Sequence, residues 1–238
     1  MRKFFSITGI FIVSIVAFLA RAAESTAPLG VPVRIDFEKM EVGSVPEDFL
    51  VLDGGFAVRE EKGNRFLELP GAPLDSFGVL LGPTADAGNS VAARIFGSAR
   101  GRRTPTFGVG LNGQGGYKLQ VAPGKKMLEL QKGDSVVKSI PFEWESGTWT
   151  RLKLRTRKAG GESVVVEGKV WKEKEKEPET WLLTFDDTTA PSPGRPSLWG
   201  NPYAGTPIRY DDLEISTAGP GGVPTPGDKG DAKTVEAK

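Results

Sequence analysis

Short stretches in which apolar and polar residues alternate follow one another along residues 31–217. In "VPVRIDFEKM", alternation places Val31, Val33, Ile35 and Phe37 on one face and charged residues on the other. A period of two residues is typical of a β-strand with one buried face. We count about a dozen such strands, and beyond the N-terminal segment no stretch has the period of a helix. The pattern predicts an all-β protein.

Glycine and proline separate these stretches, and the chain holds 31 Gly and 18 Pro. Two strands should flank a turn at residues 53–55. The stretch "GYKLQVAPGKKMLELQKGDSVVKSI" should form a meander with turns at 123–124 and 133–134. By contrast, "WKEKEKEPET" has no apolar stripe, and we interpret it as a solvated loop between Trp171 and Trp181.

Strands that follow one another in this way pack as a two-sheet sandwich or close into a barrel. No repeat of a few tens of residues is visible, which argues against a propeller or a solenoid. We expect one folded domain over residues 31–217, preceded by a linker at 23–30. Residues 218–238 are rich in Pro, Gly and charge, have little to bury, and should form a disordered tail.

Residues 1–22 have the pattern of a secretory signal peptide. Arg2 and Lys3 precede the apolar run "FFSITGIFIVSIVAFLA", and Ala20-Arg21-Ala22 fits the small-x-small cleavage rule. An uncleaved membrane anchor is the alternative, but the run is at the short end for a spanning helix. We therefore expect cleavage before Ala23 and a secreted or periplasmic protein.

Charge and composition narrow the function classes. Loss of residues 1–22 would turn the formal charge from +1 to −2, which offers no reason to expect a nucleic-acid or membrane partner for the mature chain. The chain has no Cys and no His. Catalytic triads, His-ligated zinc and imidazole acid–base chemistry are therefore excluded. Any catalysis would use carboxylates, Lys, Tyr or an oxygen-ligated metal.

Six motifs occur in an order that resembles the concanavalin A-like lectin/glucanase superfamily, in its laminin-G-like branch. They are "IDFE", "WESGTWTRLKLRTR", "VEGKVW", "PETWLLTFDD", "PSPGRPSLWGNPYAG" and "IRYDDLEI". The resemblance covers nearly all of residues 31–217 and implies a two-sheet antiparallel jelly-roll sandwich. Its members include sugar-binding domains, adhesion modules and β-glycanases, so the fold alone does not choose a function.

The catalytic Glu-x-Asp-x-Glu signature of the glucanases in this superfamily is absent from the sequence. The nearest spacing is Glu143 and Glu145 in "FEWES". Carboxylates two residues apart on a strand lie about 7 Å apart, near the separation that glycosidases use. The neighbouring Pro141 and Gly147 instead favour a solvated loop beside a packed Trp144.

The strand "WTRLKLRTR" and its expected partner "ESVVVEGKVW" predict a polar, outward sheet face. In folds of this kind that face can hold a glycan, with aromatic rings stacking on sugars and charged groups bonding hydroxyls. The candidate ligand-binding residues there are Arg151, Lys153, Arg155, Glu167, Lys169 and Trp171. The alternative is an ordinary polar face with cross-strand ion pairs.

Tyr117, Trp199 and Tyr203 are further aromatic candidates for ligand contact. The last two lie in "SLWGNPYAGTP", whose Pro and Gly predict an irregular loop that could rim a site. The alternative for Trp199 is a plug at the end of the sandwich. The stretch "FGVGLNGQGGY" lacks a following helix for phosphate, so its strand glycines predict a bulge or a close backbone approach.

Acidic residues at the two ends of the domain suggest a metal site. The resemblance implies a structural Ca²⁺ near the first and last strands, with Glu38, Asp211 and Asp212 as candidate ligands. Strict alternation in "IRYDDLEI" would place Asp211 on one face with Leu213. The alternative is that backbone N–H groups and arginines satisfy Asp211, because an unpaired buried carboxylate is costly.

These observations leave three hypotheses. The first is an exported, non-catalytic module that binds a polysaccharide or glycan, or another surface. The second is a carboxylate-based glycoside hydrolase that acts on a polysaccharide. The third is a structural envelope protein without a small ligand.

Overall fold

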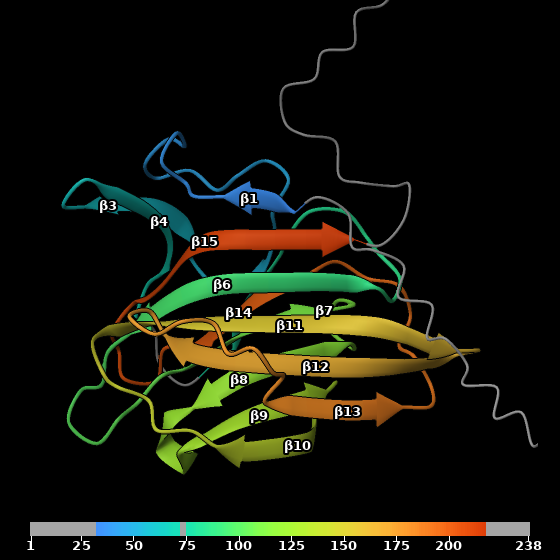
Figure 1. The fold of residues 1–238 in the computed structure, drawn as a ribbon. Helices are drawn as coiled ribbons and strands as arrows, with labels where there is room; N and C mark the ends of the chain where they lie inside the picture. The colour runs from blue at the N-terminus through green and yellow to red at the C-terminus, as the bar shows by residue number, and fades with distance from the viewer. Residues whose placement is uncertain (1–31, 72–74, 218–238) are drawn as a thin grey trace, which may run out of the picture.

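The computed structural model describes residues 32–71 and 75–217, and they form two antiparallel β-sheets packed face to face (Figure 1). The first sheet holds eight strands, in the order β13 (Leu183–Asp187), β12 (Ser163–Lys172), β11 (Thr148–Gly160), β6 (Asn89–Gly97), β15 (Ile208–Thr217), β4 (Asn64–Leu69) and β3 (Ala57–Glu61), with β1 (Val33–Ile35) also paired to β15. The second holds seven, in the order β10 (Ser135–Pro141), β9 (Met127–Lys132), β8 (Tyr117–Ala122), β7 (Thr106–Leu111), β14 (Ser197–Asn201), β5 (Phe77–Leu80) and β2 (Leu50–Asp53).

This architecture confirms the predicted all-β, two-sheet antiparallel sandwich, with fifteen strands among the described residues instead of about a dozen. One short 3₁₀ helix, η1 (Pro123–Lys125), is the exception to strand and loop within those ranges. The predicted signal peptide, the linker, Val31 and the predicted tail lie outside the described residues. No helix in the described part of the chain has the length and apolar character needed to span a membrane.

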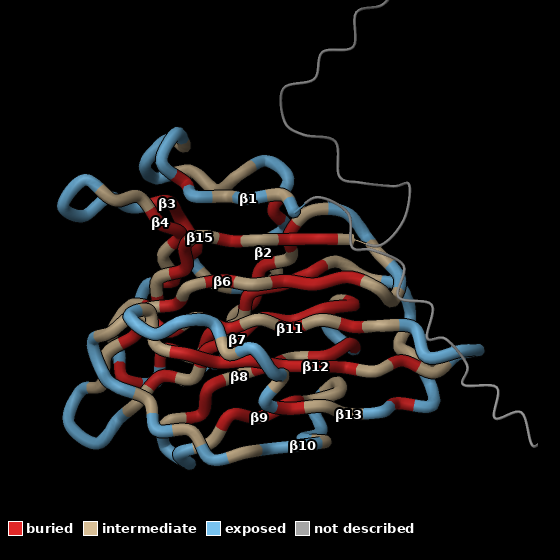
Figure 2. The backbone as a smooth tube through the Cα atoms, in the orientation of Figure 1, coloured by how far each residue is buried: buried red, intermediate tan, exposed pale blue. Residues whose placement is uncertain are grey.

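The core lies between the two sheets and follows the two-residue period of the strands (Figure 2). On β11, Leu152 and Leu154 are completely buried, and on β8 Leu119 and Val121 are too. Burying one such side chain contributes about 1.5–3 kcal/mol. The intervening residues of the same strands point away from the core, so each sheet presents a polar outer face. The two outer faces differ, and that difference locates the candidate site.

Strands β8, β9 and β10 pair consecutively, which confirms the predicted meander and both of its turns. The prediction for residues 53–55 is wrong in one respect. Strands do flank this turn, but Val51 pairs with Val79 in the seven-stranded sheet whereas Val58 pairs with Leu67 in the other. The turn crosses between sheets and does not close a hairpin. A hairpin and a crossover between sheets give the same alternation of apolar and polar residues, so the sequence pattern could not distinguish them.

The first strand is shorter than predicted, because β1 ends at Ile35. Phe37 is buried as expected, but it has a φ of 60° and has left the strand. Its ring packs edge-on against Phe49, with 6.2 Å between the ring centroids. The burial of Phe37 therefore comes from a turn and not from strand alternation.

The last strand contains a β-bulge at the two adjacent aspartates. Asp211 pairs with Arg94 on β6, but the next pair along β15 is Glu214 with Ala92, so β15 holds one extra residue. Asp212 has a φ of 47° at this point. The extra residue resets the alternation, so both Tyr210 and Leu213 face the core. The prediction that Asp211 shares a face with Leu213 is therefore wrong.

Candidate functional site

The face predicted to bind ligand, on the outside of β11 and β12, lies under a segment of the chain. Residues 173–181, here called the covering loop, connect β12 to β13 and cross in front of this sheet (Figure 1). Glu177 of this loop lies 3.1 Å from the ammonium group of Lys153 and 3.2 Å from that of Lys169. Lys169 also donates a 2.6 Å hydrogen bond to the carbonyl oxygen of Pro178. The loop is thus tied to the sheet by charge and hydrogen bonds.

Trp181, at the end of the covering loop, stacks against two cations of the sheet. Its ring centroid lies 4.2 Å from the guanidinium carbon of Arg155 and 4.6 Å from Nζ of Lys169. Arg155 and Arg157 both donate to Oε2 of Glu167, at 2.7 and 3.0 Å. Burial disfavours ionised Glu167, but the two arginines outweigh it and hold the pKa of this carboxyl below its usual value.

These contacts correct the prediction of an exposed face. Glu167, Lys169 and Trp171 are buried, while Arg151, Lys153 and Arg155 are half-buried in the same patch. The alternative, a polar face with cross-strand ion pairs, describes what the structure contains. The covering loop lacks an apolar stripe, as predicted, but its carboxylates match the lysines and arginines of β11 and β12. Ligand binding by these six residues stays a prediction.

Asp211 lies further along the same outer face and is almost completely buried. Its Oδ2 accepts hydrogen bonds from Arg94 at 2.6 Å and from Asn64 at 2.9 Å, and its Oδ1 accepts one from the backbone N–H of Asp212. Burial raises the pKa of Asp211, and the bonds from Asn64 and Arg94 oppose that rise. Asp212 is half-exposed and pairs with Arg151 at 2.9 Å.

The three candidate metal ligands do not fit a calcium site. Calcium takes six to eight oxygen ligands. The carboxylates of Asp211 and Asp212 instead face the guanidinium groups of Arg94 and Arg151. Glu38 accepts a hydrogen bond from the backbone N–H of Arg65. Within residues 32–71 and 75–217, no group of three or more acidic residues is placed to hold a metal ion.

Removal of calcium should therefore leave the melting temperature unchanged. A stabilising ion present at one hundred times its Kd would add about 2.7 kcal/mol to the free energy of unfolding. For a domain of this size that corresponds to a rise of several degrees. Thermal denaturation in excess EDTA and in excess CaCl₂ measures the difference. A clear rise with calcium would contradict the arginine-satisfied arrangement of Asp211 and Asp212.

Tyr117 belongs to the core and cannot contact a ligand at the surface, which corrects its candidate role. Its side chain is 1% exposed, and its hydroxyl donates a 2.7 Å hydrogen bond to Asp187. Burial raises the pKa of Tyr117, and the hydrogen bond to Asp187 adds to that rise. The hydroxyl is therefore neutral and acts as a donor between the sheets.

The outer face of the seven-stranded sheet carries a different arrangement, centred on Trp199. This residue lies on β14 between two neighbouring strands and pairs with Gly78 on β5 and Gly108 on β7. A Cβ atom at Gly78 would lie 2.6 Å from Cζ3 of the indole, and one at Gly110 would lie 3.0 Å from its Nε1. The glycines thus make room for the indole to lie along the sheet, as the predicted close approach requires.

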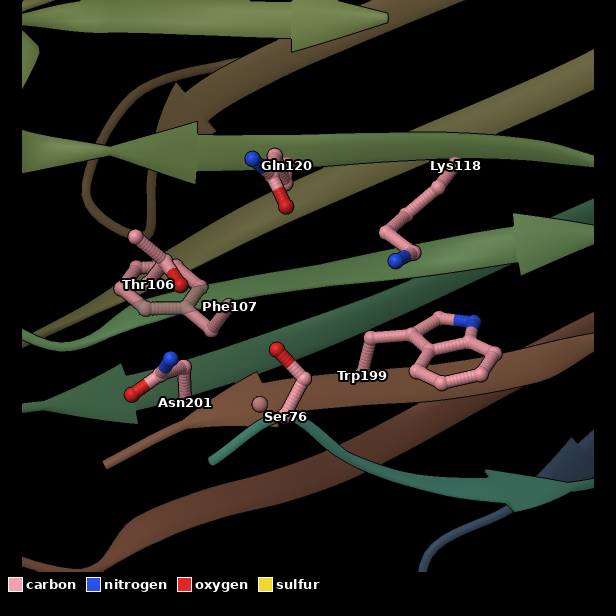
Figure 3. Close-up of a pocket in the computed structure, with 8 residues that line it drawn as sticks. Ser76, Thr106, Phe107, Lys118, Gln120, Trp199 and Asn201 are labelled. Atoms are coloured by element: carbon pink, nitrogen blue, oxygen red, sulfur yellow. The ribbon is translucent and has the colours of Figure 1, made fainter. Parts of the chain in front are cut away.

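The indole of Trp199 forms one side of a shallow hollow. The hollow is small and open to solvent, and it is lined by Ser76, Thr106, Phe107, Lys118, Gln120, Trp199, Gly200 and Asn201 (Figure 3). The Nε1 of Trp199 donates a 2.8 Å hydrogen bond to Ser197, which fixes the ring in its plane. The ammonium group of Lys118 lies 4.3 Å from the ring centroid. Burial lowers the pKa of Lys118.

Polar groups beside the indole are held by neighbours in the sheet. Gln120 donates a 2.9 Å hydrogen bond to Glu129, and Lys125 donates one of 2.8 Å to the other oxygen of Glu129. Burial disfavours ionised Glu129, but Lys125 and Gln120 outweigh it and lower its pKa. The amide oxygen of Asn201 is buried and has no hydrogen-bond partner among the described residues. Such a group needs a donor.

Of the aromatic candidates, Trp199 lines the hollow. The prediction of an irregular loop is wrong for Trp199, because Ser197–Asn201 form strand β14; Tyr203 lies two residues beyond this strand and is 44% exposed. Sequence reasoning missed Lys118, Gln120 and Asn201. Alternation in "GYKLQVA" does place Lys118 and Gln120 on the face opposite Leu119. The sequence pattern does not show that β14 pairs with β7, and this pairing brings Lys118 and Gln120 close to Trp199.

No family model and no curated protein sequence matches this chain. Several solved structures share its fold. A protein of unknown function with a galectin-like fold from Bacillus subtilis is 13% identical, with a TM-score of 0.55 over 81% of this chain and 99% of that one. The apo form of the Crh5 transglycosylase is 12% identical, with a TM-score of 0.51 over 82% and 91% of the two chains.

A sialidase is also similar, at 10% identity and a TM-score of 0.53 over 78% of this chain, but the match covers 18% of the sialidase. Identities this low show the fold alone. The fold is a jelly-roll sandwich of the lectin/glucanase-like type, and it agrees with the fold that the sequence resemblance implies.

Proposed function

We propose that this protein is an exported, non-catalytic carbohydrate-binding module that holds its glycan at the hollow around Trp199. The observation that supports it is the indole itself, which lies on a glycine floor with polar groups on either side. Aromatic rings pack on the C–H faces of sugar rings, while amides and ammonium groups bond the hydroxyls. Export rests on the predicted signal peptide.

Lys118 does not prevent stacking on Trp199. A lysine over an indole contributes about 0.5–2 kcal/mol, rising with burial, and a sugar ring that stacks on the indole in its place replaces that contact. The displaced ammonium would then bond to the sugar. Gln120 and Asn201 supply amide groups on the far side of the hollow. Asn201 is half-buried, and its amide N–H₂ group would donate a hydrogen bond to a sugar hydroxyl.

The neighbours in fold are consistent with this proposal. Two of them, the sialidase and the transglycosylase, are named for activities on glycans, and one structure of the transglycosylase is a complex with NAG. Neither their activities nor their sites transfer at these identities.

The carboxylates support binding over hydrolysis. Glycosidases need two carboxyls about 5–10 Å apart at the scissile bond, one of them with a raised pKa. None of the residues that line the hollow is acidic. Glu143 and Glu145, the nearest match in the sequence, are exposed and pair with Lys126 and Lys172. Asp211, whose pKa is raised, is enclosed by Arg94.

Trp199→Ala should weaken glycan binding at least about tenfold, because the stacking surface is lost. A glycan array on the purified protein identifies a ligand, and isothermal titration calorimetry then gives the dissociation constants. The matched control is Trp181→Ala, which removes an indole from the opposite sheet and should leave affinity unchanged. Failure of the wild type to bind any glycan, or equal binding by Trp199→Ala, would overturn the proposal.

A further inference from the structure

Lys118 brings a positive charge into the hollow that no carboxylate neutralises. Among the described residues, no Asp or Glu lies within ion-pair distance of its ammonium group, although the more distant Asp134 contributes a favourable field. The nearby Glu129 is already paired with Lys125 at 2.8 Å. Lys118 is half-buried and has the indole of Trp199 as its neighbour. The attraction between a half-buried ammonium and an anion is stronger than the same attraction in open water, because the local dielectric constant is lower.

A second group of cations lies next to the hollow. The connection between β6 and β7 forms a tight turn, closed by backbone hydrogen bonds between Arg100 and Arg103. Arg100, Arg102 and Arg103 are exposed and, in the described part of the chain, make no ion pair. We call residues 100–103 the basic hairpin.

The basic hairpin is close to the hollow along the chain and in space. Thr106, which lines the hollow, is three residues beyond Arg103, a distance of at most about 10 Å in extended chain. A Cβ atom at Gly124 would lie 3.4 Å from the hydroxyl of Thr104, so the hairpin joins the seven-stranded sheet beside η1. Lys118 pairs with Gly110, four residues along β7 from Thr106, so unpaired positive charge lies at both ends of the hollow (Figure 3).

We propose that the hollow binds an acidic polysaccharide, one whose sugars carry carboxylates as in uronic acids. The sugar on Trp199 would place its carboxylate on Lys118, and later sugars would pair with the basic hairpin. This inference rests on the proposed function and names its ligand class. A polymer of phosphate is the alternative polyanion, and the test includes it as a competitor.

The test compares each acidic glycan with its own neutral form. Oligosaccharides of galacturonate, glucuronate and mannuronate are titrated before and after chemical reduction of their carboxylates to hydroxymethyl groups. At least one acidic form should bind about tenfold more tightly than its reduced partner, since a hydrogen bond to a charged group is lost on reduction. That difference should shrink as NaCl is raised, because salt screens the exposed arginines.

Two variants test which cations of the protein bind the carboxylates of the oligosaccharide. Lys118→Gln should remove the preference for the acidic form of short oligosaccharides, so that the acidic and reduced forms bind with equal affinity. Arg102→Gln combined with Arg103→Gln should weaken longer acidic oligosaccharides and leave the short ones unaffected. The matched control is Lys176→Gln, which makes the same charge change on the exposed covering loop of the opposite sheet and should have no effect.

The outcomes separate this inference from the proposed function. Trp199-dependent binding with equal affinity for acidic and reduced forms would overturn the acidic ligand and keep the carbohydrate site. Absence of binding to acidic and neutral glycans alike would overturn both. Single-stranded DNA of equal length serves as a competitor, and tighter binding of DNA than of every uronate would overturn the acidic polysaccharide.

Discussion

Arg94→Met should lower the free energy of unfolding by about 3–5 kcal/mol, because it leaves the buried carboxylate of Asp211 without its cation. Arg94 is 17% exposed and Asp211 is 1% exposed, and 2.6 Å separate their charged groups. Asn64 and a backbone N–H would remain as donors to Asp211. The variant would also lose the stacking of Arg94 on Trp149, at 4.5 Å. Urea denaturation measures the change.

Two further variants test whether the loss of stability comes from the unpaired carboxylate of Asp211. Arg94→Met combined with Asp211→Asn should recover part of the stability, since no buried charge is then left unpaired. Arg34→Met removes an arginine that is 74% exposed and pairs with Glu214, and it should cost less than about 1 kcal/mol. A double variant no more stable than Arg94→Met would contradict this account of Asp211.

Glu167→Ala should lower the free energy of unfolding by about 2 kcal/mol at neutral pH. The side chain of Glu167 is 8% exposed and accepts from both Arg155 and Arg157. Its removal leaves two guanidinium groups without this acceptor, but both are partly exposed and regain water, so the cost is smaller than at Asp211. Glu145→Ala, which breaks an exposed pair with Lys172, is the control and should change stability by less than about 1 kcal/mol.

The effect of Glu167→Ala should depend on pH. The folded-state pKa of Glu167 lies below the usual 4.5, so its contribution is fully present above that value and is lost as the pH falls through the folded pKa. Wild type and Glu167→Ala should therefore converge in stability below pH 4.5. The same direction holds for Glu177 of the covering loop, whose pKa Lys153 and Lys169 lower against the opposing effect of burial. A gap that widens in acid would contradict this assignment.

The two outer faces of the sandwich differ in what covers them. The covering loop, its ion pairs and Trp181 close the face of the eight-stranded sheet. On the seven-stranded sheet, glycines in β5 and β7 allow Trp199 to lie flat beside half-buried polar groups. Both faces carry an indole next to lysine, but at Trp199 the cation has no carboxylate partner among the described residues. We infer that the first face serves stability and the second serves binding.

Local alternation along the chain was enough to predict most of the strands, the meander and the fold class, but not β14, which was expected to be an irregular loop. The reason is that a strand with one buried face shows its period in its own residues, as in Leu152 and Leu154. The same alternation predicted that Arg151, Lys153 and Glu167 point away from the core. These features depend on neighbours that are close in sequence.

Tertiary structure alone decided which outer face is covered and where the polar groups of the site converge. The covering loop has an ordinary solvated composition, and it becomes a cover through lysines that its own sequence does not show. Trp199 and Lys118 are far apart along the chain and meet because β14 inserts between β5 and β7. Because of the bulge at Asp212, Asp211 and Leu213 point to opposite faces of the sheet. Asp211, a candidate calcium ligand, therefore lies on the outer face and pairs with Arg94. Pairing between distant strands sets each of these contacts, and a single-residue shift in register changes the face of every residue after it.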